Sequence, residues 1–327
     1  MQTTSISRRT AIAFGSALVA TLLTLGQASA QSGYPNRDIT FVVPYSPGAS
    51  GDILSRKYTA LLSKILNTTV VVSNVPGGSG TIGTVEIFGA EPDGYTIGYG
   101  HNSPLAIAPH KSTGLPYSGI DDFTAISGIG HQATTITVNS DSKWTNFAEF
   151  AADAKADPGR ISIAVGGAGN VKDMQLQQLQ KAAGIEFNIV PFAGGGAEAV
   201  VAVMGGIVDA VAVNASSVRG QIESGDLRPL AIIADSTEEK IDGFEVVTAE
   251  EYPGMKYLQD SSGIIGPKGL PAEIVTVLEN AHQQIMEDPE FKAMLEADSY
   301  IVDAANAEGY HEQLLADFAN FGEIYGK

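Results

Sequence analysis

The order of apolar and polar positions after Pro35 predicts strands and helices in alternation. "DITFVVPY" (Asp38–Tyr45) is an almost continuous apolar run, which is typical of a buried strand, and Asp52–Leu66 places apolar residues at helical spacing. The alternation continues with a strand in "TTVVVSNV", a helix over Thr81–Ala90 and a strand in "GYTIGYG". Strands separated by helices indicate βαβ units and a mostly parallel sheet with helices on both faces.

The strand–helix alternation is interrupted over Ala125–Val138, where the chain is extended, apolar and rich in threonine. A second alternating series follows this segment. The pattern there predicts, in order, helix Asn146–Ala156, strand Arg160–Val165, helix Val171–Ala183, strand "FNIVPF", helix Ala197–Met204, strand "VDAVAVN", helix Ser216–Glu223 and strand "LRPLAIIA". A connecting strand near Tyr257–Gly266 then precedes the C-terminal helices Ala272–Glu287, Glu290–Ala297 and Glu308–Tyr325. Two series and a returning C-terminal segment predict two α/β lobes with a ligand cleft between them.

The first 30 residues have the pattern of a cleaved export signal. Arg8 and Arg9 precede an apolar run, Ala11–Leu25, and Ala28-Ser29-Ala30 is a typical cleavage site. The run is shorter than the roughly 20 apolar residues that a membrane span needs. The pattern leaves open whether the general or the twin-arginine export route is used. We therefore expect residues 1–30 to be removed, with 31–130 plus 262–327 forming the first lobe and 131–261 the second.

Charge and cysteine content narrow the possible functions. The chain has a formal net charge of −18, which argues against nucleic acid and anionic membranes as partners. An anionic ligand would need a local positive site, because the overall field repels it. The absence of cysteine excludes thiolate chemistry, cysteine-bound metal and a cysteine-linked lipid anchor. The expected mature protein is a soluble periplasmic protein without a lipid anchor.

Glycine-rich loops are the best candidates for binding. Each of four such loops connects a predicted strand to a predicted helix: Val43–Asp52, Asn74–Gly83, Val165–Asp173 and Pro191–Ala199. In an open parallel sheet these loops lie at the carboxyl ends of the strands, where ligands bind. Each loop leads to a helix N-terminus, whose free N–H groups attract anions. Several converging ends could hold a carboxylate, whereas any single loop could equally be a tight turn.

The second loop also spells G-x-G-x-x-G at Gly78–Gly83, the spacing of a dinucleotide-binding fingerprint. That function needs an acid about 20 residues later to hold the ribose, and Tyr99–Pro104 contains none. The five histidines lack metal-ligand spacing. His101 and His131 are expected near the cleft, whereas His282 and His311 are expected at the surface. No nucleophile, base and oxyanion site come together, so we expect no catalytic residue, cofactor or metal.

Six blocks in order resemble the solute-binding proteins of tripartite tricarboxylate transporters, the Bug family. The blocks include "VVPYSPGASGD", "NVPGGSGTIG" followed by "PDGYT", "ADPGRISIAVGGAGN", "VPFAGGGAEAV", "SGDLRPLAI" and "GPKGLPAEIV". The resemblance covers essentially the whole mature chain. It implies a two-lobed periplasmic binding protein of type II, the Venus flytrap fold. It further implies a small carboxylate ligand, membrane permease subunits as partners, and a monomer.

The resemblance also implies which residues contact the ligand, one carboxylate being gripped through backbone N–H groups and bridging waters. In the first lobe they would be Ser46, Pro47, Gly48, Ala49, Ser50, Asp52, Asn74, Pro76, Gly77 and Gly78. In the second lobe they would be Gly167, Ala168, Gly169, Asn170 and Asn214. Asn102 and Ser103 are added because they directly follow a predicted strand at the cleft.

Three departures from the family pattern bear on the ligand. The first loop reads Pro47-Gly48-Ala49-Ser50 rather than P-G-G. Ala49 therefore places a methyl group where the family commonly has a glycine whose backbone can approach the ligand. Val213 replaces a common Asp, and members that bind amino acids need an acid for the ammonium group. "DSSG" (Asp260–Gly263) replaces a frequent Trp, which leaves a smaller and more polar cleft wall. Two alternatives to transport stay open: a binding protein that feeds a signalling receptor, and an exported hydrolase on the same fold.

Overall fold

The computed structural model describes residues 33–326, and one compact unit that begins at Arg37 holds both of its sheets. The expected export signal, residues 1–30, lies outside the described residues. Within residues 33–326, none of the helices combines the length and the apolar character that crossing a bilayer requires.

The first sheet contains six strands drawn from both ends of the chain. They are β1 (Ile39–Val43), β2 (Val70–Asn74), β3 (Thr96–His101), β4 (Phe123–Gln132), β11 (Ser261–Pro267) and β12 (Tyr300–Val302). Their order across the sheet is β12-β4-β11-β3-β1-β2. β1 lies between β3 and the edge strand β2, and its residues are almost all buried, with Phe41 and Val42 fully inaccessible to solvent.

The second sheet also has six strands, all from the middle of the chain. They are β5 (Thr134–Asn139), β6 (Ser162–Val165), β7 (Asn188–Pro191), β8 (Ala210–Asn214), β9 (Leu227–Ile233) and β10 (Glu245–Val247). Their order is β10-β9-β5-β8-β6-β7. β8 is buried along its whole length, which explains its short apolar sequence "AVAVN".

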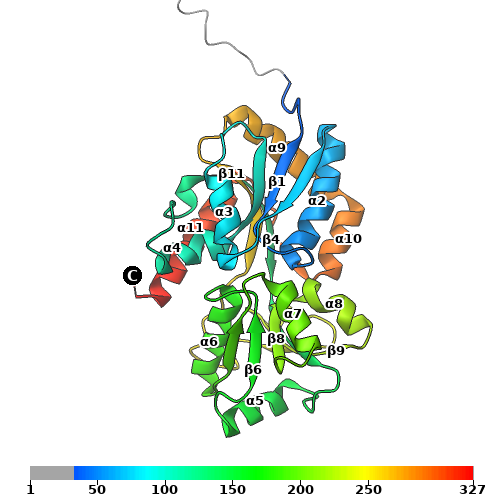
Figure 1. Cartoon of the computed structure of the whole chain (residues 1–327), viewed down its shortest axis with the longest axis vertical. Coiled ribbons are helices and arrows are strands. Elements are labelled where there is room, and N and C mark those ends of the chain that lie inside the picture. The colour runs from blue at the N-terminus through cyan, green and yellow to red at the C-terminus, as the bar shows by residue number, and fades with distance from the viewer. Residues whose placement is uncertain (1–32, 327) are drawn as a thin grey trace, which may run out of the picture. The chain divides into compact units, whose positions relative to one another are not determined.

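Helices cover both faces of each sheet, as the sequence predicted (Figure 1). The helices beside the first sheet are α2 (Ser50–Leu66), α3 (Thr81–Phe88), α4 (Ala108–Lys111), α9 (Ala272–Glu287), α10 (Pro289–Ala297) and α11 (Ala307–Ile324). Those beside the second sheet are α5 (Phe147–Ala156), α6 (Val171–Ala183), α7 (Gly196–Met204) and α8 (Ala215–Glu223). Short turns of 3-10 or π-helix complete the fold: η1 (Gly78–Gly80), η2 (Ser103–Ile107) and η3 (Ile120–Asp122).

Both sheets are mixed, which corrects the expectation of mostly parallel sheets. β1, β2 and β3 pair in parallel, as do β6, β7 and β8, in agreement with the alternating sequence pattern. β11 is antiparallel to both β3 and β4, and β5 is antiparallel to both β8 and β9. The reason is that these strands belong to the segments that cross between the sheets, rather than to βαβ units.

The chain passes from one sheet to the other with hardly any linker. β4 ends at Gln132 and β5 begins at Thr134, whereas the return to the first sheet begins at Ser261. The two crossing segments lie side by side. The Gln132 backbone N–H donates to the Asp260 carbonyl oxygen at 3.4 Å. The change of sheet falls close to residues 131 and 261, but the division into two lobes at these residues stays a prediction.

The sequence predicted His282 at the surface, and this prediction is wrong because the residue is buried. The side chain is only 3% exposed, on the face of α9 that packs against α2, and its Nδ1 lies 3.2 Å from the Tyr58 hydroxyl. Burial lowers the pKa of His282 to about 4, so this histidine is a neutral core residue. His311 does lie partly exposed, 3.1 Å from Asp121.

We expect the Gly263→Ala substitution to lower the free energy of unfolding by about 1–3 kcal/mol, the usual cost of overpacking. A methyl group at Gly263 would lie 2.3 Å from the Ser127 carbonyl oxygen and 2.5 Å from the Tyr310 ring. Urea denaturation followed by circular dichroism measures the change. Gly114→Ala is the matched control, since a methyl group there meets nothing within 4 Å. Equal stability of the two variants would show that β11 tolerates a side chain at residue 263.

Candidate ligand-binding site

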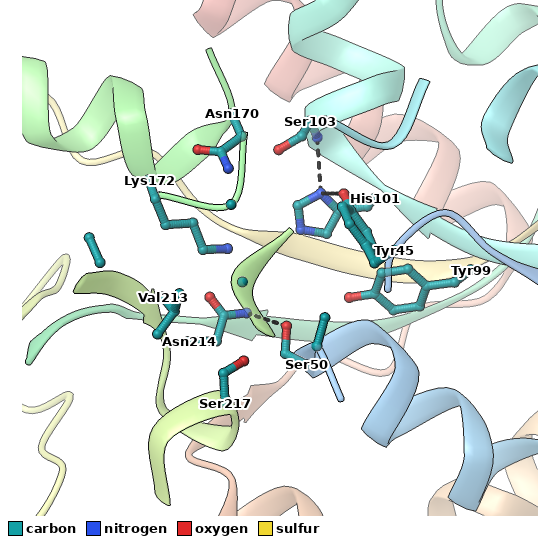
Figure 2. A pocket seen from close by; sticks show the side chains of 14 residues that line it. Tyr45, Ser50, Tyr99, His101, Ser103, Asn170, Lys172, Val213, Asn214 and Ser217 are labelled. Atoms are coloured by element: carbon teal, nitrogen blue, oxygen red, sulfur yellow. Dashed lines mark hydrogen bonds between the residues drawn. The ribbon is translucent and has the colours of Figure 1, made fainter. Parts of the chain in front are cut away.

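A small cavity lies where the carboxyl ends of β1 and β3 face those of β6 and β8. Its volume is about 40 Å³. Figure 2 shows side chains from both sheets and from the helices that follow them pointing into it. The lining residues are Tyr45, Ala49, Ser50, Tyr99, His101, Ser103, Gly166, Asn170, Lys172, Gly196, Ala212, Val213, Asn214 and Ser217.

Direct contacts join the two sides of this cavity. The Ser46 N–H donates to the Gly194 carbonyl oxygen at 3.2 Å, and the Ser79 hydroxyl donates to the Ala168 carbonyl oxygen at 3.0 Å. Asn214 Nδ2 lies 3.3 Å from the Ser50 hydroxyl oxygen. With a volume of about 40 Å³, the cavity has room for a few water molecules. A ligand of several heavy atoms enters only if these contacts separate.

Three helices begin at the cavity, and their N-terminal N–H groups make it attractive to anions. α2 begins at Ser50, α7 at Gly196 and α8 directly after Asn214. None of the three has a side-chain cap from any residue that the structure describes. Each N-terminus carries a partial charge of about +0.5. By contrast α6 is capped, because the Asn170 side chain accepts the Asp173 N–H.

A buried ion pair forms one wall of the cavity. The Asp260 side chain is fully buried, and its Oδ2 contacts Lys172 Nζ and lies 3.0 Å from Asn214 Nδ2. His101 Nε2 lies 3.0 Å from Asp260 Oδ1. Burial would raise the pKa of Asp260, but Lys172 and His101 outweigh it and hold that pKa well below its usual range. Burial lowers the pKa of Lys172, and Asp260 opposes this shift.

Hydrogen bonds fix the orientation of His101. Its Nδ1 lies 3.1 Å from the Ser103 backbone N–H and 3.1 Å from the Tyr45 hydroxyl. Because a backbone N–H can only donate, the ring proton resides on Nε2, which faces Asp260. His101 Nε2, which carries the proton, therefore faces Asp260 Oδ1 at 3.0 Å, and Tyr45 and Tyr99 pack around the ring (Figure 2).

The structure gathers some of the predicted ligand contacts around this cavity. Ala49, Ser50, Ser103, Asn170 and Asn214 line it directly. A neighbouring cavity of about 440 Å³ shares Ser103 with the first. Four further predicted residues line that second cavity: Gly78, Gly167, Ala168 and Gly169.

Other predicted contacts support the loops rather than line either cavity. Asp52 accepts bonds from the Gly48 N–H, Asn74 Nδ2 and Arg56 Nε, at 2.9, 2.9 and 3.0 Å. Asn102 is fully buried and donates from Nδ2 to the Gln259 carbonyl oxygen at 2.5 Å. Ser46 takes part in the Gly194 contact described above. The remaining predicted residues are Pro47, Pro76 and Gly77, and these lie outside the lining of both cavities.

The charged part of the site was missed by the sequence reasoning. Lys172 follows a glycine-rich loop in the first turn of α6, and this position was the one available signal. Asp260 was noted only as part of a polar "DSSG" segment. Of the two cleft histidines considered, His101 lines the cavity, whereas His131 Nδ1 lies 2.6 Å from Gln259 Nε2. Between residues 33 and 326 no group of three or more His, Asp or Glu side chains could hold a metal ion.

Comparison with known proteins shows the family to which the chain belongs. Residues 54–324 match the family model described as the tripartite tricarboxylate transporter family receptor. The chain is 31% identical to Protein BugT of Bordetella pertussis over 265 residues, which cover 81% of this chain and 80% of BugT.

Solved structures of this kind have the same fold. The periplasmic binding protein BugD is 27% identical with a TM-score of 0.80, over 90% of this chain and 98% of BugD. MatC from Rhodopseudomonas palustris, solved with bound malate, is 22% identical with a TM-score of 0.77, over 89% of this chain and all of MatC (100%). The chain therefore belongs to the tripartite tricarboxylate transporter receptor family, and it is a solute-binding receptor rather than an enzyme.

Proposed function

We propose that this protein binds a small carboxylate in the cavity between β1, β3, β6 and β8 and delivers it to the permease of a tripartite tricarboxylate transporter. The observation that carries the proposal is the convergence of three helix N-termini, those of α2, α7 and α8, on one cavity. A chain with a net charge of −18 needs such a local source of positive potential to attract an anion.

The strength of these interactions is sufficient for a receptor. Hydrogen bonds from N–H groups to a carboxylate contribute roughly 1.5–3 kcal/mol each. Three or four of them correspond to micromolar affinity. MatC, which shares the fold, holds malate, a dicarboxylate, and a ligand of that size is in keeping with our proposal. In this proposal the protein acts as a monomer in the periplasm, and the contacts between Ser46 and Gly194 and between Ser79 and Ala168 form as the ligand is enclosed.

We expect the Ser50→Pro substitution to weaken carboxylate binding about tenfold or more while the fold is retained. Ser50 is the first residue of α2, where proline is well tolerated and removes only an N–H group that has no helical partner. Ala49 has φ −72° and ψ 158°, a conformation that a following proline accepts. Loss of one charge-assisted bond corresponds to about ten- to hundredfold in affinity.

Isothermal titration calorimetry with a panel of C3–C6 carboxylates measures this change. Ser50→Ala keeps the N–H group and should lose much less affinity than Ser50→Pro. Ala272→Pro makes the same change at the first residue of α9, away from the cavity, and should leave affinity unchanged. If wild type binds a sugar or a cation but no carboxylate, the proposed function is wrong. Loss of carboxylate uptake on deletion of the gene would separate transport from sensing.

A further inference from the structure

We propose that the Lys172–Asp260 pair selects carboxylates that carry a hydroxyl group beside the carboxylate and rejects those that carry an ammonium group there. This inference rests on the proposed function, because it assigns a ligand class to the same cavity. It assigns a role to Lys172 and Asp260, two side chains that the proposed function does not use.

Asp260 is a buried carboxylate whose charge is already neutralised by a lysine. Its Oδ2 contacts Lys172 Nζ and Asn214 Nδ2, whereas His101 Nε2 lies 3.0 Å from Oδ1, which has no hydrogen-bond partner among residues 33–326. His101 contributes a neutral N–H group, as its bond from the Ser103 N–H requires. Lys172 therefore supplies the cation that neutralises Asp260, and a ligand ammonium group would be a second cation at this place.

Lys172 also faces the ligand space. Its side chain is 12% exposed and lines the cavity, with Nζ directed toward the interior (Figure 2). An ammonium group has three N–H donors. Within the described part of the chain Lys172 Nζ has one ion-pair partner, Asp260, so two donors remain for a ligand. These donors suit an oxygen acceptor on the ligand and repel a ligand ammonium group.

Asn214 provides the complementary acceptor. Its Nδ2 faces Gln132 Oε1 at 2.7 Å and Asp260 Oδ2 at 3.0 Å, and because the Asp260 carboxylate accepts, the amide orientation is fixed. Asn214 is 3% exposed, and its Oδ1 has no hydrogen-bond partner among residues 33–326. A buried acceptor without a partner is costly, so a ligand donor at this place gains affinity.

A hydroxyl group satisfies both neighbours at once. Its oxygen accepts from Lys172 Nζ, and its O–H donates to Asn214 Oδ1. A ligand ammonium group could donate to Asn214, but it would lie beside the Lys172 ammonium in a poorly solvated site, where like charges are strongly unfavourable. A carbonyl group could accept from Lys172 but would leave Asn214 unpaired. A 2-hydroxy acid therefore fits better than the 2-amino or 2-oxo acid with the same skeleton.

The test compares hydroxy and amino acids of the same skeleton by isothermal titration calorimetry: lactate with alanine, malate with aspartate, and 2-hydroxyglutarate with glutamate. The pair that contains the tightest wild-type ligand is used throughout. We expect wild type to prefer the hydroxy acid by at least about a hundredfold. Lys172→Ala should lose about tenfold or more on the hydroxy acid and gain on the amino acid. The reason is that it opens space for a ligand ammonium group beside Asp260.

Two controls separate selection from structural support. Lys172→Ala combined with Asp260→Asn removes both charges, so it should bind both acids with similar affinity. Lys181→Ala, at the far end of α6, should keep the wild-type preference. Thermal unfolding of each variant confirms that it is folded under the conditions of the titration.

The outcomes distinguish this inference from the proposed function. If wild type binds no member of the panel of carboxylates, the proposed function fails. If wild type binds carboxylates but prefers the amino acid, or if Lys172→Ala leaves the hydroxy-to-amino preference unchanged, this inference fails and the proposed function stands. The Lys172–Asp260 pair would then be a structural ion pair that happens to lie beside the ligand.

Discussion

The Asp260→Ala substitution should lower the free energy of unfolding by about 3–5 kcal/mol at pH 7, the usual cost of leaving one member of a buried ion pair without its partner. Lys172 would lose its carboxylate partner in a place where its side chain is 12% exposed, and it has no other ion-pair partner among the described residues. Urea denaturation followed by far-UV circular dichroism measures the loss. Lys172→Met combined with Asp260→Asn removes both charges while keeping similar shapes, and it should unfold within about 1 kcal/mol of wild type.

The pH dependence gives an independent check of the same ion pair. Because the pKa of Asp260 is held well below its usual range, the folded state favours the ionised carboxyl group. The stability that Asp260 contributes is therefore present above the unfolded pKa of about 3.9 and is lost as the pH falls toward the folded value. Below about pH 4, wild type should approach or fall below the double variant in stability. If Asp260→Ala and wild type unfold at the same urea concentration, the pair contributes no net stability.

The Asp317→Asn substitution should raise the free energy of unfolding by up to about 3 kcal/mol at pH 7.5. Asp317 lies on α11, 7% exposed, and its Oδ2 accepts from the Ser261 hydroxyl at 2.6 Å and from Asn102 Nδ2 at 3.2 Å. Burial raises the pKa of Asp317 to about 6, and Asp260 adds to the shift, whereas the two hydrogen bonds oppose it. Asparagine keeps an acceptor oxygen for Ser261 and Asn102 without the charge.

The sign of the pH dependence follows from the raised pKa. The folded state binds the Asp317 proton more tightly than the unfolded state, so this group favours folding below about pH 4. That contribution is lost as the pH rises from about 4 to about 6. Each pKa unit corresponds to about 1.4 kcal/mol, which gives the expected 3 kcal/mol. Urea titrations of both proteins at several pH values measure the difference, which should be close to zero at pH 4. A difference that does not vary with pH would rule out this explanation.

Much of the fold could be predicted from the sequence, because its elements follow local patterns. α6 and α9 were predicted with the bounds that the structure has, Val171–Ala183 and Ala272–Glu287. Their apolar spacing and, for α6, the Asn170 cap and the left-handed Gly184 mark the ends in the sequence itself. The short strands β10 and β12 were missed, since three residues carry too little periodicity to stand out from a loop.

The candidate site was harder to predict because part of it depends on distant pairing. Of the four glycine-rich loops, those before α2 and α7 lead to uncapped helix N-termini that line the cavity, whereas the N-terminus of α8 follows β8 without such a loop and was not predicted to attract an anion. Lys172 and Asp260, however, are 88 residues apart, and nothing in either segment shows that the other will neutralise it. The antiparallel crossing strands bring Asp260 beside Gln132 and Asn214, and this arrangement is a property of the tertiary structure rather than of any motif.

The uncapped helix N-termini have a consequence for how such receptors diverge. Backbone N–H donors persist when side chains change. Relatives that share only about a third of their residues, such as BugT at 31% identity, can therefore keep helix N-termini that attract an anion. In our proposal, selectivity resides in a few side chains beside these N-termini. A lineage could then change its ligand by exchanging residues such as Lys172 and Asp260, while the helix N-termini that attract the anion stay the same.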